Sequence, residues 1–328
     1  MARKTRLSSS LPGWLFGSLK LQAIITSDYP MTERQTLSYL QKSFQRARLQ
    51  PQTRYGQNFL IDLNLVQMIA DTAQLSRRDI VLEVGTGMGS LTSLLALKAG
   101  HVVTVEIDRH LAELARGEFS SLDNVTLLEQ DALKNKNHFH PTVLETLKEK
   151  LASVSGARLK LVANLPYNIA TPILSNLLYV EPWPFQLVAT IQRELAQRIT
   201  ARPRTKDYSA LSVWFQSQCR CEIVRVMPPD VFWPRPKVES AILSIVPQKV
   251  LRDRIADRRH FHDLIRKIFL HRRKYLRSAL YSAVKTELEK TQVDEIMSKL
   301  EINATARAEE LTPQQLIELC DLVRQSTN

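Results

Sequence analysis

The chain has 328 residues, 44% of them hydrophobic, which is enough for one α/β domain of about 200 residues and a smaller second domain. Its 45 Lys and Arg outnumber its 33 Asp and Glu, and the net charge of +12 favours a polyanionic partner. Three cysteines are too few for a disulfide framework, and no apolar run reaches the length of a membrane-spanning helix. A disulfide-stapled secreted domain is therefore excluded, and we expect a cytoplasmic protein that holds no metal and contacts no membrane.

The first 50 residues show little regular pattern, most clearly before residue 31. Residues 1–10 are basic and rich in serine, and prolines and glycines interrupt the partly apolar stretch at 11–26. A transit peptide, a disordered tail or a gene start placed too far upstream would each give this pattern, whereas a secretory signal fits it poorly. Because a more regular amphipathic segment begins at Met31, we favour a start placed too far upstream for this N-terminal extension.

The next informative feature is a glycine-rich turn. Residues 80–84 form an apolar, β-branched run, as in a parallel strand that is buried on both faces. Three alternating glycines follow, Gly85, Gly87 and Gly89. Residues 90–98 then predict a helix and 102–107 a second strand, in which Glu106 stands about 20 positions after the turn, where an acid binds ribose hydroxyls. The G-x-G-x-G spacing differs from the dinucleotide fingerprint, which makes a nicotinamide cofactor the weaker alternative.

A third strand is predicted at residues 125–130, with Asp131 at its end. Ligands of an open α/β sheet bind outside the carboxyl ends of its strands, so we expect Gly85, Glu106 and Asp131 to line one rim. An acid at the end of a strand is also a common helix cap. The regular placement of three such residues favours a cofactor that carries a nucleoside.

A fourth strand, residues 159–164, ends in the tetrapeptide Asn164, Leu165, Pro166 and Tyr167. The Asn164 oxygen and a nearby main-chain carbonyl can accept both N–H groups of an exocyclic amine on a flat base. Pro166 fixes φ and donates no hydrogen bond, and Tyr167 offers a stacking face worth ~1–3 kcal/mol. S-adenosylmethionine is an already activated methyl donor, so positioning accounts for most of the rate. An isolated tetrapeptide of this kind would be read as a rigid turn. Here it follows a strand of the same sheet as the glycine turn, which favours methyl transfer to a base nitrogen.

The region from 252 to 277 is strongly basic, with aromatic residues interleaved. Its members are Arg252, Arg254, Arg258, Arg259, Phe261, Arg266, Lys267, Phe269, Arg272, Arg273, Lys274, Tyr275 and Arg277. Apolar residues such as Leu264 and Ile268 predict helices with one core face, which would leave the basic side chains pointing outward. A merely solvated face is the simpler alternative, but the clustering favours contact with an RNA backbone, which positions RNA without reading its sequence.

These motifs, in this order, resemble the small-subunit ribosomal RNA adenine N6,N6-dimethyltransferases of the KsgA/RsmA type. The resemblance runs from about residue 55 to about residue 280. It rests on residues 56–60, the glycine turn, 105–108, 164–167 with 171–174, 192–198, 211–213, 228–240 and 272–277. It implies a Rossmann-like class I S-adenosylmethionine-dependent methyltransferase sheet, followed by a smaller all-helical C-terminal domain.

The resemblance also implies roles for individual residues. The residues expected to contact the cofactor are Asn58, Leu60, Gly85, Gly87, Glu106, Asp131 and Asn164. Those expected to hold the target adenine are Asn164, Leu165, Pro166, Tyr167 and Phe232, and those expected to bind RNA are Arg272, Arg273, Lys274 and Arg277. The usual substrate of the family is a pair of adjacent adenosines in the 3′-terminal hairpin of small-subunit rRNA, each methylated twice. We therefore expect a monomer that acts on rRNA within a pre-ribosomal particle.

The expected organisation is an N-terminal extension at 1–50, a catalytic domain at 51–246 and a helical RNA-recognition domain at 247–328. The segment 135–158, between the third and fourth predicted strands, is longer than the family leads us to expect. Its residues 143–154 predict a surface helix. Two rival functions remain. A related enzyme could methylate large-subunit rRNA and confer macrolide resistance, or a non-enzymatic relative could act in assembly or transcription. The intact Asn164–Tyr167 tetrapeptide and Glu106 argue against the second rival.

Overall fold

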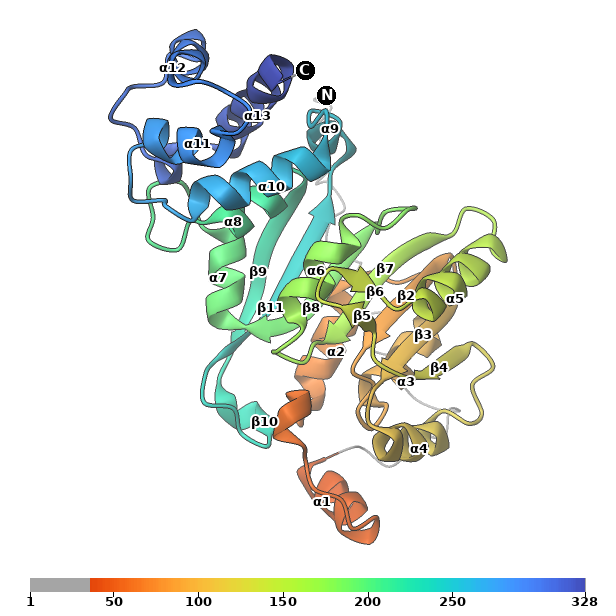
Figure 1. The fold of residues 1–328 in the computed structure, drawn as a ribbon. Coiled ribbons are helices and arrows are strands. Elements are labelled where there is room, and N and C mark those ends of the chain that lie inside the picture. The colour runs from red at the N-terminus through yellow and green to blue at the C-terminus, as the bar shows by residue number, and fades with distance from the viewer. Residues whose placement is uncertain (1–35, 328) are drawn as a thin grey trace, which may run out of the picture. The chain divides into compact units, whose positions relative to one another are not determined.

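The computed structural model of the chain describes residues 36–327. Its main sheet has seven strands in the order β4-β3-β2-β7-β8-β11-β9 (Figure 1). Strands β4, β3, β2, β7 and β8 are parallel neighbours, whereas β11 runs antiparallel to both β8 and β9. The strands are β2 (Asp79–Val84), β3 (His101–Glu106), β4 (Val125–Glu129), β7 (Arg158–Asn164), β8 (Gln186–Gln192), β9 (Cys219–Met227) and β11 (Ser240–Pro247). The four strands expected from the sequence are confirmed as β2, β3, β4 and β7.

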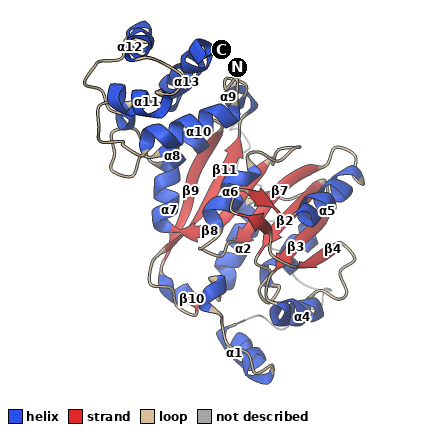
Figure 2. Cartoon of the chain, in the orientation of Figure 1, coloured by secondary structure: helices blue, strands red, loops and turns tan. Residues whose placement is uncertain are grey.

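Helices lie on both faces of this sheet (Figure 2). They are α2 (Leu63–Thr72), α3 (Ser90–Lys98), α4 (Arg109–Glu118), α5 (Pro141–Ala152), α6 (Ala170–Leu177), α7 (Arg193–Thr200) and α8 (Ala210–Gln216). Every residue of β2 is buried, and alternate side chains enter different cores. Ile80 and Leu82 belong to the cluster that includes α5 and α6, and Val81 to the cluster that includes α2 and α3. This two-sided burial explains why β2, apart from Asp79 and Glu83, is apolar on both faces instead of alternating.

Three smaller elements frame the carboxyl edge of the sheet. Helix α1 (Leu37–Arg46) is capped by Thr36 and buries Leu40 and Phe44 in a cluster with Met88 and Leu111. Strand β1 (Phe59–Leu60) pairs with β10 (Phe232–Trp233), and the short helices η1 (Thr53–Tyr55) and η2 (Pro229–Val231) flank them. The segment 37–46 of the expected N-terminal extension is therefore a packed helix. The expectations for residues 1–35 lie outside the described residues.

The longer segment at 135–158 contains a hairpin and a helix. Strands β5 (Leu133–Asn135) and β6 (His138–Phe139) pair, and α5 follows, with Pro141 in its first turn and Val143 and Leu147 buried. The helix expected at 143–154 is thus confirmed with a shift of two residues at each end. The hairpin was missed, because its strands are two or three residues long and carry little periodicity.

The region after Pro247 is helical, as expected. It contains α9 (Lys249–Arg252), α10 (Arg258–Phe269), α11 (Leu276–Val284), α12 (Lys290–Lys299), the short η3 (Ala308–Glu310) and α13 (Pro313–Thr327). Its buried side chains, such as Phe261 and Leu280, belong to the same apolar cluster as Trp214 of α8 and the strand residue Leu161. The division of residues 51–328 into two domains therefore stays a prediction. Within residues 36–327 we find no helix that is both long and apolar enough to span a membrane.

The expectation that all basic residues after 252 point outward is wrong for Arg252. This side chain is only 9% exposed, and its guanidinium contacts the Glu181 carboxylate at 2.5 Å. It also lies 4.3 Å from the centroid of the Trp183 ring. A cation over an aromatic face and beside a carboxylate is stabilised without water. Arg252 thus packs the start of the helical region against the loop before β8.

A buried ion cluster ties β2 to β7 at the end of the sheet opposite the glycine turn. Asp79 is 0% exposed, and Arg158 lies 2.9 Å from one of its oxygens and Lys160 3.3 Å from the other. The pKa of Lys160 is lowered, mainly by burial, and the charge of Asp79 partly opposes this shift. The Lys160 Nζ also donates to the main-chain carbonyls of Ala73 and Gln74. The carboxylate therefore compensates two cations at the start of both strands.

We predict that Asp79→Asn lowers the free energy of unfolding by about 3–5 kcal/mol, because it leaves Lys160 charged, buried and uncompensated. Asp71→Asn is the control, since its pair with Lys98 is exposed and is worth about 0–1 kcal/mol. Urea denaturation followed by circular dichroism measures both. Equal losses in the two variants would contradict the role given to the buried pair.

Candidate active site

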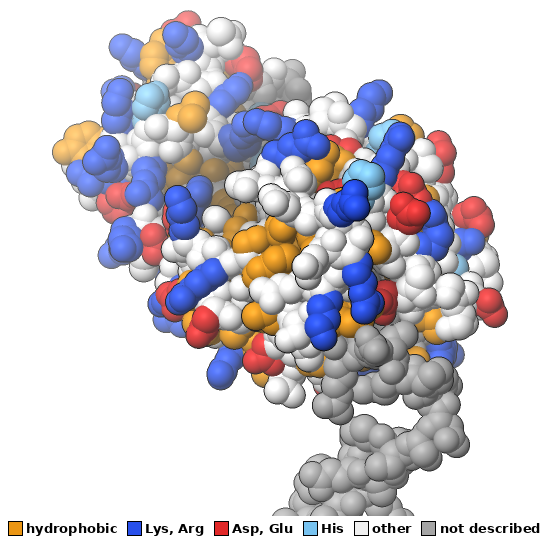
Figure 3. Space-filling model, turned by 90° about the horizontal axis from the view of Figure 1, so that it is seen from below, with side chains coloured by type: hydrophobic (Ala, Val, Ile, Leu, Met, Phe, Trp, Pro, Cys, Tyr) orange, Lys and Arg blue, Asp and Glu red, His pale blue; other side chains and the backbone are white. Residues whose placement is uncertain are grey.

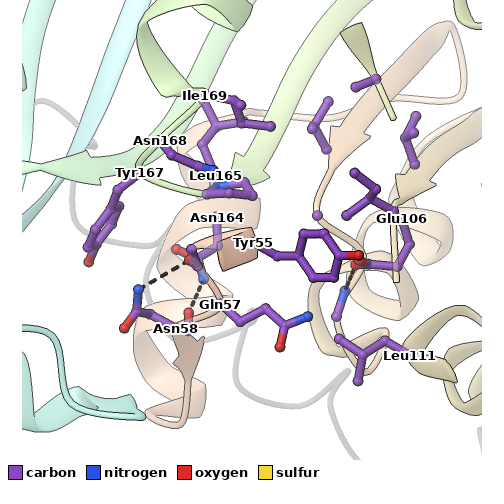
Figure 4. A pocket seen from close by; sticks show the side chains of 18 of the residues that line it. Tyr55, Gln57, Asn58, Glu106, Leu111, Asn164, Leu165, Tyr167, Asn168 and Ile169 are labelled. Carbon is purple, nitrogen blue, oxygen red and sulfur yellow. Dashed lines mark hydrogen bonds between the residues drawn. The ribbon is translucent and has the colours of Figure 1, made fainter. Parts of the chain in front are cut away.

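A cavity of about 300 Å³ lies at the carboxyl ends of β2, β3 and β7 and is closed on one side by residues 54–59. Nine residues singled out from the sequence line it: Asn58, Gly85, Gly87, Glu106, Asp131, Asn164, Leu165, Pro166 and Tyr167. Figure 4 shows Glu106 on one side of the view and the Asn164–Tyr167 tetrapeptide on the other, with the Tyr55 ring between them. Segments that are more than 100 residues apart in the chain, such as 58 and 164, therefore meet in one cavity.

The glycine turn forms the floor of this cavity. Gly85 has φ of 87° and Gly87 has φ of 56°, which is the left-handed region that other residues rarely adopt. A Cβ on Gly85 would lie 3.2 Å from Pro166 Cδ, and one on Gly87 would lie 3.2 Å from the Phe59 ring. The turn thus needs glycine both for its backbone angles and for the close approach of the tetrapeptide and of residue 59.

Glu106 is fixed at the tip of β3 and is only 4% exposed. One oxygen accepts the Gly87 N–H at 2.9 Å, and the other accepts the Asp108 N–H at 3.0 Å. Burial raises the pKa of Glu106, and these two hydrogen bonds oppose that rise. The carboxylate therefore has a fixed position and retains lone pairs for hydroxyl donors in the cavity.

Asn164 is held by its amide nitrogen. Its Nδ2 donates to the Asn58 carbonyl at 2.9 Å, and the Asn58 amide in turn donates to the Gly56 carbonyl at 3.2 Å (Figure 4). This leaves the Asn164 Oδ1 as an acceptor beside the cavity. The next peptide is fixed as well, because the Leu165 N–H donates to the Thr190 carbonyl at 3.1 Å.

Several cavity residues were not singled out from the sequence. They are Arg54, Tyr55, Gln57, Ile107, Leu111, Gln130, Asn168 and Ile169, besides Gly56, Phe59, Val84, Val105 and Ala132. The only sequence signal for them was their place in or next to a motif, since most lie within or beside residues 56–60, 105–108 or 164–167. Ile107 and Leu111 add apolar surface to the cavity close to Glu106.

Glu83 was also missed. An acid inside the apolar run 80–84, two residues before Gly85, is unusual. It is 1% exposed, and the hydroxyls of Thr92 and Thr104 each donate to its Oε2 at 2.6 Å. Burial raises the pKa of Glu83 to about 7. The acid joins β2, β3 and the first turn of α3 directly behind the glycine turn.

Two of the expected residues do not line the main cavity. Leu60 and Phe232 face each other across the β1–β10 pair, with 8% and 2% exposure, inside an apolar cluster. Leu60 instead borders a cavity of about 60 Å³ behind Gly85 and Asn164. The contacts expected of Leu60 with cofactor and of Phe232 with the target base stay predictions.

The four basic residues expected to bind RNA are divided by the structure. Arg272 donates from one nitrogen to the Lys206 and Tyr208 carbonyls, at 2.6 and 2.9 Å, and so fixes the loop before α8. Arg277 forms a two-point ion pair with Asp294, with one contact of 2.7 Å. Arg273 and Lys274 are exposed and form no ion pair within residues 36–327. Within residues 36–327 we also find no group of three or more His, Cys, Asp or Glu side chains that could hold a metal ion.

A family model described as ribosomal RNA adenine dimethylase matches residues 48–325. The chain belongs to the ribosomal RNA adenine dimethylase family. Among its curated relatives, the protein named ribosomal RNA small subunit methyltransferase A of Halothermothrix orenii is 37% identical over 262 residues, covering 80% of this chain and 84% of that protein. The protein of the same name from Ligilactobacillus salivarius is 38% identical over 281 residues, with 83% and 90% covered. S-adenosylmethionine is the cofactor of the enzyme.

Two solved structures show the same fold. A dimethyladenosine transferase from Plasmodium falciparum has a TM-score of 0.68 at 22% identity and covers 81% of this chain and 97% of its own. The 23S rRNA methyltransferase ErmE has a TM-score of 0.57 at 24% identity, with 81% and 100% covered. The Rossmann-like class I methyltransferase fold expected from the sequence is confirmed.

The residues present fit S-adenosylmethionine. The glycine turn borders the cavity with backbone alone, and the fixed carboxylate of Glu106 suits the ribose hydroxyls. Asp131, at the end of β4, suits the adenine amine. Its Oδ1 accepts the Leu133 N–H at 2.9 Å, which orients the carboxylate at the rim.

We predict that Glu106→Ala weakens binding of S-adenosylmethionine by on the order of 1.5–3 kcal/mol, because the ribose hydroxyls lose a charged acceptor. Isothermal titration calorimetry measures this loss. Glu113→Ala is the control, since Glu113 is an exposed acid on the neighbouring helix α4 and borders no part of the cavity. Unchanged affinity in a folded Glu106→Ala protein would remove Glu106 from the cofactor site.

Proposed function

We propose that the protein transfers methyl groups from S-adenosylmethionine to N6 of two adjacent adenosines in the 3′-terminal hairpin of small-subunit rRNA, twice to each. The observation that carries this proposal is the position of Asn164. Its amide nitrogen is bound to the Asn58 carbonyl, so its oxygen is an acceptor beside the cofactor cavity. The names of the curated relatives support the small-subunit substrate.

The tetrapeptide supplies positioning for the reaction. The lone pair of an adenine N6 is delocalised into the ring, so the amine is a poor nucleophile. When the Asn164 oxygen and the Leu165 carbonyl accept its two N–H groups, a pyramidal nitrogen becomes more favourable and its lone pair points at the cofactor. The sulfonium of bound S-adenosylmethionine supplies an activated methyl group. A C–N bond then forms as the C–S bond breaks, and the extra proton on nitrogen leaves to water.

Tyr167 offers the stacking face for the target adenine. The tetrapeptide sits on a loop directly after a central strand, and a base can reach it only if it leaves the RNA stack. A flipped base is commonly held between a ring and polar groups that read its edge. Stacking on a ring contributes about 1–3 kcal/mol. We assign Phe232 to the same subsite as a second apolar surface, which it reaches only if the β1–β10 pair moves.

A groove between α7, the loop 201–209 and α10 supports a path for the RNA backbone. Its volume is about 770 Å³. Four exposed basic residues line it, and none forms an ion pair within the described part of the chain: Arg198, Lys206, Arg266 and Lys267. Arg273 and Lys274 follow directly after this groove. Figure 3 shows that Lys and Arg side chains also outnumber Asp and Glu side chains on the face with β10, α1 and α4.

This charge distribution leads us to propose that residues 247–328 and the groove position rRNA, while residues 51–246 perform the chemistry. The substrate would be RNA within a pre-ribosomal particle, met in the cytoplasm, and the protein would act as a monomer. Methyl transfer from labelled S-adenosylmethionine to undermethylated small subunits, followed by nucleoside analysis, tests the proposal. We expect labelled N6,N6-dimethyladenosine in small-subunit RNA. Label in large-subunit RNA alone, or in neither, would overturn it.

We predict that Asn164→Ala slows single-turnover methylation at least tenfold, about 1.4 kcal/mol of barrier, at saturating cofactor and RNA. Because the residue also borders the cofactor cavity, cofactor affinity is measured separately by calorimetry. Asn137→Ala, in the exposed turn between β5 and β6, serves as the matched control and should keep the wild-type rate. A near wild-type rate for Asn164→Ala would contradict its role in gripping the amine.

We predict that reversing Arg273 and Lys274 to Glu weakens RNA binding and flattens its salt dependence by about 2 logarithmic slope units, since fewer counterions are released. Cofactor affinity should stay unchanged because neither residue borders the cavity. The double variant Lys136→Glu, Lys148→Glu, which reverses two exposed charges around α5, is the control. Filter binding across a salt series gives both slopes, and an intact slope would make the basic segment a solvated face.

A further inference from the structure

One hydrogen bond joins the proposed stacking residue to a strand that belongs to no part of the cofactor site. The Tyr167 hydroxyl and the Ser240 Oγ lie 2.5 Å apart, and either can be the donor. The two residues are 73 positions apart in the chain, and Ser240 is 0% exposed. Ser240 does not border the cavity, so its hydroxyl reaches the site only through Tyr167.

The direction of β11 explains how Ser240 comes to this place. In a parallel sheet, only residues at the carboxyl ends of strands reach the edge where ligands bind. Strand β11 is antiparallel to β8, so its first residue, Ser240, lies opposite Gln192 at the end of β8. The neighbouring main chain is tied to the same point, because the Arg193 N–H donates to the Glu239 carbonyl at 2.9 Å.

The Tyr167 ring would otherwise be fixed at one end only. Its main chain packs against Gly56, where an added Cβ would lie 3.4 Å from the Tyr167 nitrogen. The side chain can still rotate about χ1, which moves the ring and its hydroxyl together, and about χ2, which turns the plane of the ring. A hydrogen bond at the hydroxyl fixes the end of the ring and therefore χ1. Because a phenol hydroxyl prefers hydrogen bonds in the plane of its ring, the same bond also limits rotation about χ2.

We propose that Ser240 is a positioning residue for methyl transfer, which holds the Tyr167 ring in the plane that stacks the target adenine. This inference rests on the proposed function. Within residues 36–327 the Ser240 hydroxyl has no other hydrogen-bond partner, so its loss breaks this one contact. Ser240 acts on the orientation of the base and not on cofactor binding. Its removal should therefore lower the rate at saturation and leave both affinities unchanged.

A double-mutant cycle tests the proposal. Single-turnover methylation of undermethylated small subunits, at saturating cofactor and RNA, is measured for the wild type, Ser240→Ala, Tyr167→Phe and the double variant. We expect each single variant to be about fivefold slower, as for the loss of one ordinary hydrogen bond, and the double variant to be no slower than either. Tyr167→Phe removes the other partner of the same bond, and Tyr167 is only partly buried. The test therefore holds even if Ser240→Ala folds poorly.

Ser244→Ala is the matched control. It removes a serine hydroxyl from the same strand, four residues away, where the Oγ accepts a bond from Gln186 at 3.3 Å, and it should keep the wild-type rate. A second readout is the fluorescence of 2-aminopurine at the target position, which stacking on a ring quenches. Ser240→Ala should lessen this quenching while RNA affinity is unchanged.

The outcomes separate this inference from the proposed function. Wild-type protein that leaves small-subunit RNA unmethylated would overturn both. Wild-type protein that methylates it, with a double variant about 25-fold slower, the product of two independent fivefold effects, would overturn the role of Ser240 alone. So would a wild-type rate for Ser240→Ala, or a loss that disappears when cofactor concentration is raised.

Discussion

Parallel strands of one sheet all end at the same edge, and the cofactor cavity of this protein depends on that constraint. The glycine turn ends β2, Glu106 ends β3 and Asn164 ends β7. The two buried cores on either side of the sheet fix the register of these strands and hence the height of each tip. The buried Asp79 cluster fastens β2 to β7 at the opposite end. The positions of the cavity residues at one edge of the sheet therefore depend on apolar packing along its whole length.

The antiparallel strand β11 adds something that parallel strands could not provide. A strand that begins at the carboxyl edge brings its first residues to the site, and the chain delivers Ser240 to Tyr167 in this way. The same strand continues into the helical region, where Arg252 packs against Trp183 and Glu181. The end of the sheet that carries the proposed stacking residue and the helical region are therefore connected through one continuous strand.

The motifs that line the cavity could be predicted because chemistry restricts their residue types. Gly85 and Gly87 have backbone angles that other residues rarely adopt, and a carboxylate at 106 is a strong acceptor for hydroxyl groups, so these positions carry a readable pattern. The basic segment was readable too, but its charges are not equivalent. Arg272 and Arg277 are engaged by carbonyls and by Asp294, which no count of charges could reveal.

The sequence alone determined four of the five parallel strands, the class of cofactor and the tetrapeptide that borders the cavity, because buried strands and ligand-binding turns restrict composition locally. The tertiary structure decided which distant residues support them. Ser240 and Glu83 stand within sequence motifs and Tyr55 stands next to one, but no local pattern shows that their side chains support Tyr167, border the glycine turn or line the cavity. The tertiary structure also decided the order of β8, β11 and β9, because strand pairing depends on contacts between segments that are far apart in the chain.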